Sequence, residues 1–111
     1  MTPSNPLGTV RRLAADEANC HFYAPVLQEL RARTMDSDDL LEIISGELGE
    51  AHCYKSEKTM KYYPGTMSDY YSIWVDVCGC RMFIKLLVND IGKANEQLVV
   101  TSFKRDDAHD G

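Results

Sequence analysis

The chain has 111 residues, 44% of them hydrophobic, and carries a formal net charge of −5 at pH 7. This length and composition suit one globular domain with one core, so we treat residues 1–111 as a single domain. No run of about 18 apolar residues occurs, which excludes a membrane-spanning helix. The negative charge argues against an ordinary nucleic-acid binder, because phosphate partners favour a basic surface.

The first half of the chain predicts helices. Residues 1–6, with two prolines, predict a flexible start without a basic-then-apolar signal pattern, so we expect a cytoplasmic protein. Apolar residues spaced by three and four predict a short helix over residues 7–14. A second helix should begin near Pro25, because proline suits the first helical turn. A third carries an apolar stripe over residues 40–48, with Asp36 or Ser37 as its cap.

The second half of the chain predicts strands. Four β-like runs cover residues 52–56, 71–77, 82–88 and 98–104. Gly79 predicts a tight hairpin turn, and the polar segment 89–97 predicts a second hairpin loop. The last three runs should therefore form an antiparallel meander, with the first run near one edge. Helices followed by strands predict an α+β fold, to which residues 20–23 add a short strand or an extended link.

Several short motifs in this half occur in a distinctive order. They are Tyr54-Lys55-Ser56, Ile73-Trp74 with Asp76-Val77, the strand with Phe83 and Lys85, and Ser102-Phe103-Lys104. In this order and with these separations they resemble the MqsR family of bacterial toxins, which are small RelE-like endoribonucleases. The resemblance covers most of the chain. It implies N-terminal helices packed on a small antiparallel sheet, sequence-selective cleavage of single-stranded mRNA without metal or cofactor, and a cognate antitoxin protein as partner.

Two lysines match catalytic lysines of that family. RNA is cut when its own 2′-OH attacks the adjacent phosphate and leaves a 2′,3′-cyclic phosphate, so the enzyme must move protons and stabilise the anionic phosphorane. The resemblance implies that Lys55 and Lys104 contact the scissile phosphate. From the residues alone, the favoured interpretation is that lysines at strand ends guard a sheet edge against aggregation.

The chain departs from the family at two positions. The family has a glutamine where this chain has Val75, and a catalytic tyrosine where it has Phe83; neither replacement offers a proton or a hydrogen bond. The missing hydrogen-bonding groups would then have to be replaced by Tyr71, by another tyrosine of residues 62–71, or by Arg81. The alternative is a catalytically inactive relative of the fold that binds RNA or protein.

The long connection between the first two strands interleaves cations and aromatics. Such a mixture suits stacking on unpaired bases beside phosphate contacts, although the tyrosines could simply pack around the loop. The predicted RNA-binding residues are Lys58, Lys61, Tyr62, Tyr63 and Lys85. Trp74 would ordinarily be a core residue, with Asp76 on the same side as a hydrogen-bond acceptor.

Charge is unevenly distributed along the chain. Residues 1–51 carry four arginines against nine acids, whereas residues 52–105 carry eight lysines and arginines against five acids. The acidic residues 106–111 should be flexible, with His109 disordered, or could fold back on the basic face. The cysteines and histidines stand too close together in sequence for a chelating zinc pattern, so we expect no metal and reduced thiols at Cys20, Cys53, Cys78 and Cys80.

Overall fold

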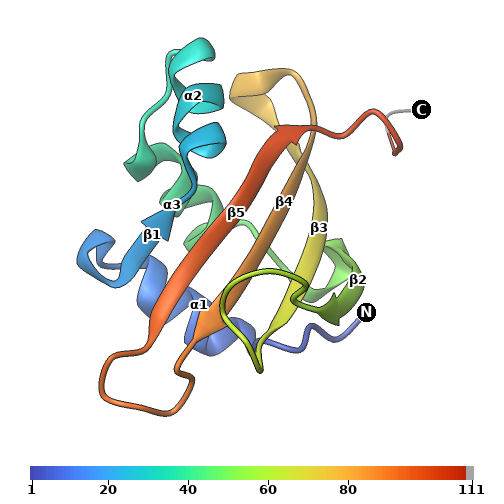
Figure 1. The fold of residues 1–111 in the computed structure, drawn as a ribbon. Helices are drawn as coiled ribbons and strands as arrows, with labels where there is room; N and C mark the ends of the chain where they lie inside the picture. Colours follow the sequence, from blue (N-terminus) through green and yellow to red (C-terminus); the bar gives the residue numbers. More distant parts are fainter. Residues whose placement is uncertain (110–111) are drawn as a thin grey trace.

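Figure 1 shows the computed structural model, which describes residues 1–109, as helices packed on one face of a sheet. The helices are α1 (Leu7–Ala14), α2 (Ala24–Ala32) and α3 (Ser37–Gly46). The strands are β1 (Cys20–Phe22), β2 (Cys53–Lys58), β3 (Met67–Val75), β4 (Cys80–Asn89) and β5 (Gln97–Arg105). They lie in the order β1-β5-β4-β3-β2, which confirms the predicted α+β class. None of the helices within residues 1–109 has the length and apolar character needed to cross a membrane.

The second and third helices begin where their start signals predicted them. Pro25 lies in the first turn of α2. Asp36 caps α3: its carboxylate accepts from the backbone N–H of Asp39 at 3.0 Å, while the Asp39 side chain accepts from the N–H of Asp36 at 2.9 Å. This reciprocal capping box satisfies two N–H groups that the helix itself leaves unpaired. α3 ends at Gly46, two residues before the predicted end of the apolar stripe.

The strand meander is also confirmed. β3, β4 and β5 pair antiparallel, and β2 pairs with β3 at the edge. Gly79 has φ of 67°, the left-handed conformation that glycine adopts without steric cost in a tight turn. The sheet is mixed rather than wholly antiparallel, because residues 20–22 form a strand that pairs parallel with β5. Three residues are too few to display a periodicity, which is why the sequence left a strand and a link equally open.

The core fills the space between the helices and the sheet. Because side chains alternate along a strand, every second residue of β3 and β4 points at the helices. In β5 the register against β4 shifts at Thr101, so Val100 and Phe103 both reach the core. The sheet side of this core includes Ile73, Val75, Met82, Ile84, Leu86, Val100 and Phe103. The helix side includes Val10, Leu13, Val26, Leu30, Leu40 and Ile44. The opposite face of the sheet carries no helix, and we call it the open face.

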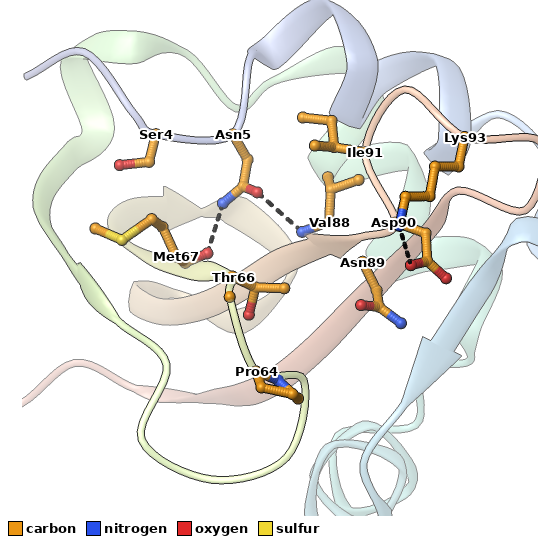
Figure 2. Close-up of a pocket in the computed structure, with 11 residues that line it drawn as sticks. Ser4, Asn5, Pro64, Thr66, Met67, Val88, Asn89, Asp90, Ile91 and Lys93 are labelled. Atoms are coloured by element: carbon orange, nitrogen blue, oxygen red, sulfur yellow. Dashed lines mark hydrogen bonds and ion pairs between the residues drawn. The ribbon is translucent and has the colours of Figure 1, made fainter.

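The N-terminal segment, predicted to be flexible, is placed by hydrogen bonds to the sheet. Asp69 of β3 is completely buried and accepts from the backbone N–H of Ser4 and of Asn5, at 2.9 and 2.8 Å. Figure 2 shows the Asn5 side chain between two strands, where it donates to the Met67 carbonyl at 2.9 Å and accepts from Val88 N–H at 3.0 Å. Asn5 thereby forms part of the wall of a cavity of about 280 Å³.

Candidate functional site

The open face carries most of the cations that the sequence singled out. Lys55 of β2 pairs with Tyr70 of β3, which pairs in turn with Lys85 of β4. One strand further, Phe83 of β4 pairs with Lys104 of β5. Directly paired residues project to the same side of a sheet, so the register alone gathers these side chains. We call the set Tyr54, Lys55, Tyr70, Phe83, Lys85 and Lys104 the lysine–aromatic surface.

Aromatic rings hold the lysines of this surface in place. The Nζ atoms of Lys55 and Lys85 lie 5.1 and 5.0 Å from the centroid of the Tyr70 ring. The Lys104 Nζ lies 5.7 Å from the centroid of Phe83, whose ring is 5.5 Å from that of Tyr70. An ammonium within about 6 Å of a ring face is attracted by the ring quadrupole. Three positive charges are thereby gathered over two adjacent rings.

Tyr54 joins this surface because β2 is irregular. The register of β2 against β3 shifts between Cys53 and Lys55, which lets consecutive residues face the same side. The Tyr54 ring accordingly lies 6.2 Å from the ring of Tyr70 and 6.5 Å from that of Phe83. In a regular strand consecutive side chains point to opposite faces, so the sequence alone would have placed Tyr54 and Lys55 on different sides of the sheet.

Hydrogen bonding fixes the protonation of the surface. The Tyr70 hydroxyl donates to Glu57, which also pairs with Lys55 at 3.2 Å. Burial and the Glu57 hydrogen bond raise the pKa of Tyr70 to about 12, whereas the bonds from Tyr70 and Lys55 lower the pKa of Glu57. At neutral pH Tyr70 therefore keeps its proton and Glu57 stays ionised. The surface offers positive charge and a phenol donor, and its neighbouring carboxylate, Glu57, is a weak base that Tyr70 and Lys55 already engage.

The predicted loop residues divide into two groups. Lys61 and Tyr62 lie on the connection between β2 and β3 and line a cavity of about 310 Å³ together with Lys85. Tyr62 is 75% exposed, which leaves its ring available for stacking. Lys58 and Tyr63 do not line this cavity, although Lys58 is exposed at the end of β2.

Tyr71, a candidate catalytic residue from the sequence, lies on the other face of β3. Its side chain is completely buried among the core residues, and its hydroxyl has no hydrogen-bonding partner within residues 1–109. Burial raises its pKa. Tyr70, one residue earlier, occupies the open face instead. A strand can place its odd-numbered or its even-numbered residues in the core, and a tyrosine is acceptable at both positions. The sequence therefore could not decide whether Tyr70 or Tyr71 faces the core.

Replacing Tyr71 with phenylalanine should leave the open face unchanged and should not lower stability. The substitution removes a buried hydroxyl that lacks a partner within the described part of the chain, and such a group costs about 1–3 kcal/mol when unsatisfied. Urea unfolding of parent and variant measures this. A marked loss of stability would instead mean that the Tyr71 hydroxyl is favourably placed in the core.

Trp74 is 50% exposed on the open face, so the expectation of a core tryptophan is wrong. It shares the alternation of Tyr70 and therefore points away from the helices. Its Nε1–H donates to Asp76 at 2.9 Å, which confirms the expected hydrogen bond. Trp74 pairs across the strands with Arg81 of β4, another candidate from the sequence.

Arg81 contributes to a second hollow on the open face. Its guanidinium donates to the hydroxyl and the carbonyl of Ser72, at 3.1 and 3.2 Å. A cavity of about 530 Å³ lies beside it, and its lining comprises Ala51, His52, Tyr54, Ser72, Trp74, Arg81 and His109. Tyr54 belongs to this cavity and to the lysine–aromatic surface, so the two adjoin. Within residues 1–109 no cluster of His, Cys, Asp and Glu could hold a metal ion.

No protein-family model matches the chain, and no curated protein is significantly similar to it in sequence.

Proposed function

We propose that the protein is an endoribonuclease that cleaves single-stranded mRNA without a metal, through a 2′,3′-cyclic phosphate, in the manner of the MqsR toxins it resembles. The observation that carries the proposal is the lysine–aromatic surface. Three lysines and a phenol donor meet on one open sheet face, where rigid strands position them. A phosphorane carries more negative charge than the phosphodiester, so fixed cations stabilise the transition state more than the ground state.

The arrangement suggests how an RNA strand would lie. Lys55 and Lys104 would contact the scissile phosphate, and the rings of Tyr70 and Tyr54 between them would stack on neighbouring bases. Lys85 borders the cavity that Lys61 and Tyr62 line, so this cavity would receive a flanking nucleotide. Arg81 lines the other cavity, beside Tyr54, and would contact the RNA on the opposite side of the scissile phosphate from Lys61 and Tyr62. A strand several nucleotides long could thereby cross the open face.

The partners follow from the same proposal. Cleavage of mRNA would take place in the cytoplasm, and a cognate antitoxin protein would hold the toxin inactive. Covering the exposed lysines of the open face would suffice for that inhibition.

A binding module without catalysis is the second candidate, and one observation favours it. Tyr70 keeps its proton at neutral pH because its pKa is raised, and Glu57 is a weak base because its pKa is lowered and its carboxylate already bonds to Tyr70 and Lys55. Phe83 provides no hydroxyl beside Lys104. RNA would then bind to the lysines and rings and remain intact unless a base outside this surface takes part.

Incubating the purified protein with a mixed-sequence RNA in EDTA tests the proposed function. We expect fragments that end in 2′,3′-cyclic phosphate, because the attacking nucleophile belongs to the RNA. Induced expression should also arrest growth. Intact RNA together with saturable RNA binding would favour the binding module, and cleavage that requires an added divalent cation would contradict the mechanism.

A further inference from the structure

The end of the chain returns to the open face. After β5, the backbone N–H of Asp106 donates to the Arg81 carbonyl at 2.9 Å, and the Asp106 side chain is only 4% exposed. His109 then places its ring 4.5 Å from the ring of Tyr54, at the edge of the cavity of about 530 Å³. Residues 110–111 of the predicted flexible tail lie outside the described residues.

A continuous hydrogen-bond network holds His109 there. The Asp106 carboxylate lies 2.9 Å from His109 Nδ1 and accepts from the His109 backbone N–H at 3.2 Å. The Ser72 hydroxyl also bonds to Asp106, and Ser72 itself accepts from Arg81 Nε at 3.1 Å. Burial favours a neutral Asp106, but the bonds from Ser72 and His109 outweigh it and lower the pKa of Asp106.

The protonation of His109 follows from this network. An ionised carboxylate can only accept a hydrogen bond, so Nδ1 of His109 must carry the proton. In the neutral ring the other nitrogen, Nε2, then has a free lone pair. A carboxylate that fixes the tautomer and orientation of an imidazole is the arrangement by which Asp–His pairs act as general bases.

We propose that His109 is the general base of the open-face site and that Asp106 is its positioning residue. The inference rests on the proposed ribonuclease function. The lysine–aromatic surface holds cations, a protonated phenol and, beside them, a carboxylate that Tyr70 and Lys55 already engage. His109 adds, next to Tyr54, a proton acceptor at Nε2 that neither of these groups occupies. The base is thus separate from the phosphate-binding cations, with Tyr54 between them.

The reaction balances with these groups. The 2′-oxygen bonds to phosphorus while its proton passes to His109 Nε2, and the bond from phosphorus to the 5′-oxygen breaks with its electron pair on that oxygen. The leaving oxygen takes a proton from solvent water, and His109 returns its proton to the hydroxide left behind. Lys55 and Lys104 stabilise the phosphorane between the two steps.

The groups around His109 and its own protonation determine how kcat/KM for RNA cleavage should depend on pH. The titratable and charged groups around it are Asp106 on its own segment, Tyr54 of β2, Arg81 of β4 and His52, which lines the same cavity. Since only neutral His109 can accept the proton, kcat/KM should rise with pH and level off once the ring is neutral.

The test compares cleavage by the full-length parent with His109→Gln, His109→Gly and Asp106→Asn. We expect His109→Gln to lower kcat about 10²- to 10⁴-fold and to abolish the rise with pH. Free imidazole should restore part of the activity of His109→Gly, which a purely structural role would not allow. Asp106→Asn should lower kcat with KM unchanged. His21→Gln, on β1 at the far edge of the sheet, is the matched control and should cleave like the parent.

The outcomes separate the base from the function. If the parent cleaves RNA, and His109→Gln cleaves within threefold of it with an unchanged pH profile, His109 is not the base while the ribonuclease function stands. If the parent leaves RNA intact under every condition, the function itself fails and this inference fails with it. Thermal unfolding of each variant shows whether a loss of activity reflects the site or the fold.

Discussion

Lys104→Ala should lower kcat/KM for RNA cleavage about 10²- to 10³-fold, the usual cost of removing one group that stabilises a developing anion. Lys104 is exposed at the end of β5, and its Nζ contacts only the face of the Phe83 ring among the contacts seen within residues 1–109. Its loss should therefore leave stability unchanged. Single-turnover cleavage of a defined RNA oligonucleotide measures the effect. Lys55→Ala should act similarly, because Lys55 borders the same pair of rings.

Two further variants make the Lys104 experiment specific. Lys104→Arg keeps the charge and should retain much of the activity, whereas Lys93→Ala removes an exposed lysine from the connection between β4 and β5 and should change little. RNA affinity provides a second readout: each lost phosphate contact should reduce the log–log salt slope of binding by about 0.7. Parent-like cleavage by Lys104→Ala would remove the lysine–aromatic surface from the reaction.

The overall acidity of the chain does not oppose this placement of RNA. Most acids of residues 1–51 belong to the helices and their caps, which lie on the opposite face of the sheet from the lysines. Charges separated by more than about 8 Å are largely screened at physiological salt. The potential that an approaching phosphate experiences is therefore set by the open face, where Lys55, Lys85 and Lys104 gather beside the carboxylates of Glu57 and Asp106, rather than by the net charge of −5.

Local patterns predicted those parts of the structure that local interactions determine. The cap at Asp36, the proline in the first turn of α2 and the turn at Gly79 each depend on a few neighbouring residues. The site was only partly predictable, because its side chains come from different strands. Alternation could not decide between Tyr70 and Tyr71, and that one-residue difference moves a phenol from the core to the open face.

The C-terminal segment illustrates the other limit. Residues 106–109 form a short segment rich in aspartate, and this composition predicts a flexible end. Their position depends on Ser72 and Arg81, which lie far earlier in the chain and become neighbours only when β3 and β4 pair. No periodicity within the segment encodes those contacts. One signal was present: a histidine three residues after an aspartate, a spacing that allows a local hydrogen bond.

Asp69→Ala should destabilise the fold by about 3 kcal/mol, because it leaves several buried donors without their acceptor. The Asp69 carboxylate binds the backbone N–H groups of Ser4 and Asn5 and the side-chain amide of Asn5, all within 2.9 Å. Without it, Asn5 would lose the anchor that lets it bridge β3 and β4. For a domain of this size the melting temperature should fall by roughly 12–20 °C.

Urea unfolding followed by circular dichroism would measure this change. Glu42→Ala removes an exposed carboxylate from α3 and should alter stability by no more than about 0.5 kcal/mol. Each variant deletes a carboxylate, which is buried and hydrogen-bonded at Asp69 and exposed at Glu42, so their comparison reports the cost of the orphaned donors. An Asp69→Ala protein as stable as the Glu42→Ala control would mean that the hydrogen bonds from Ser4 and Asn5 to Asp69 are energetically neutral.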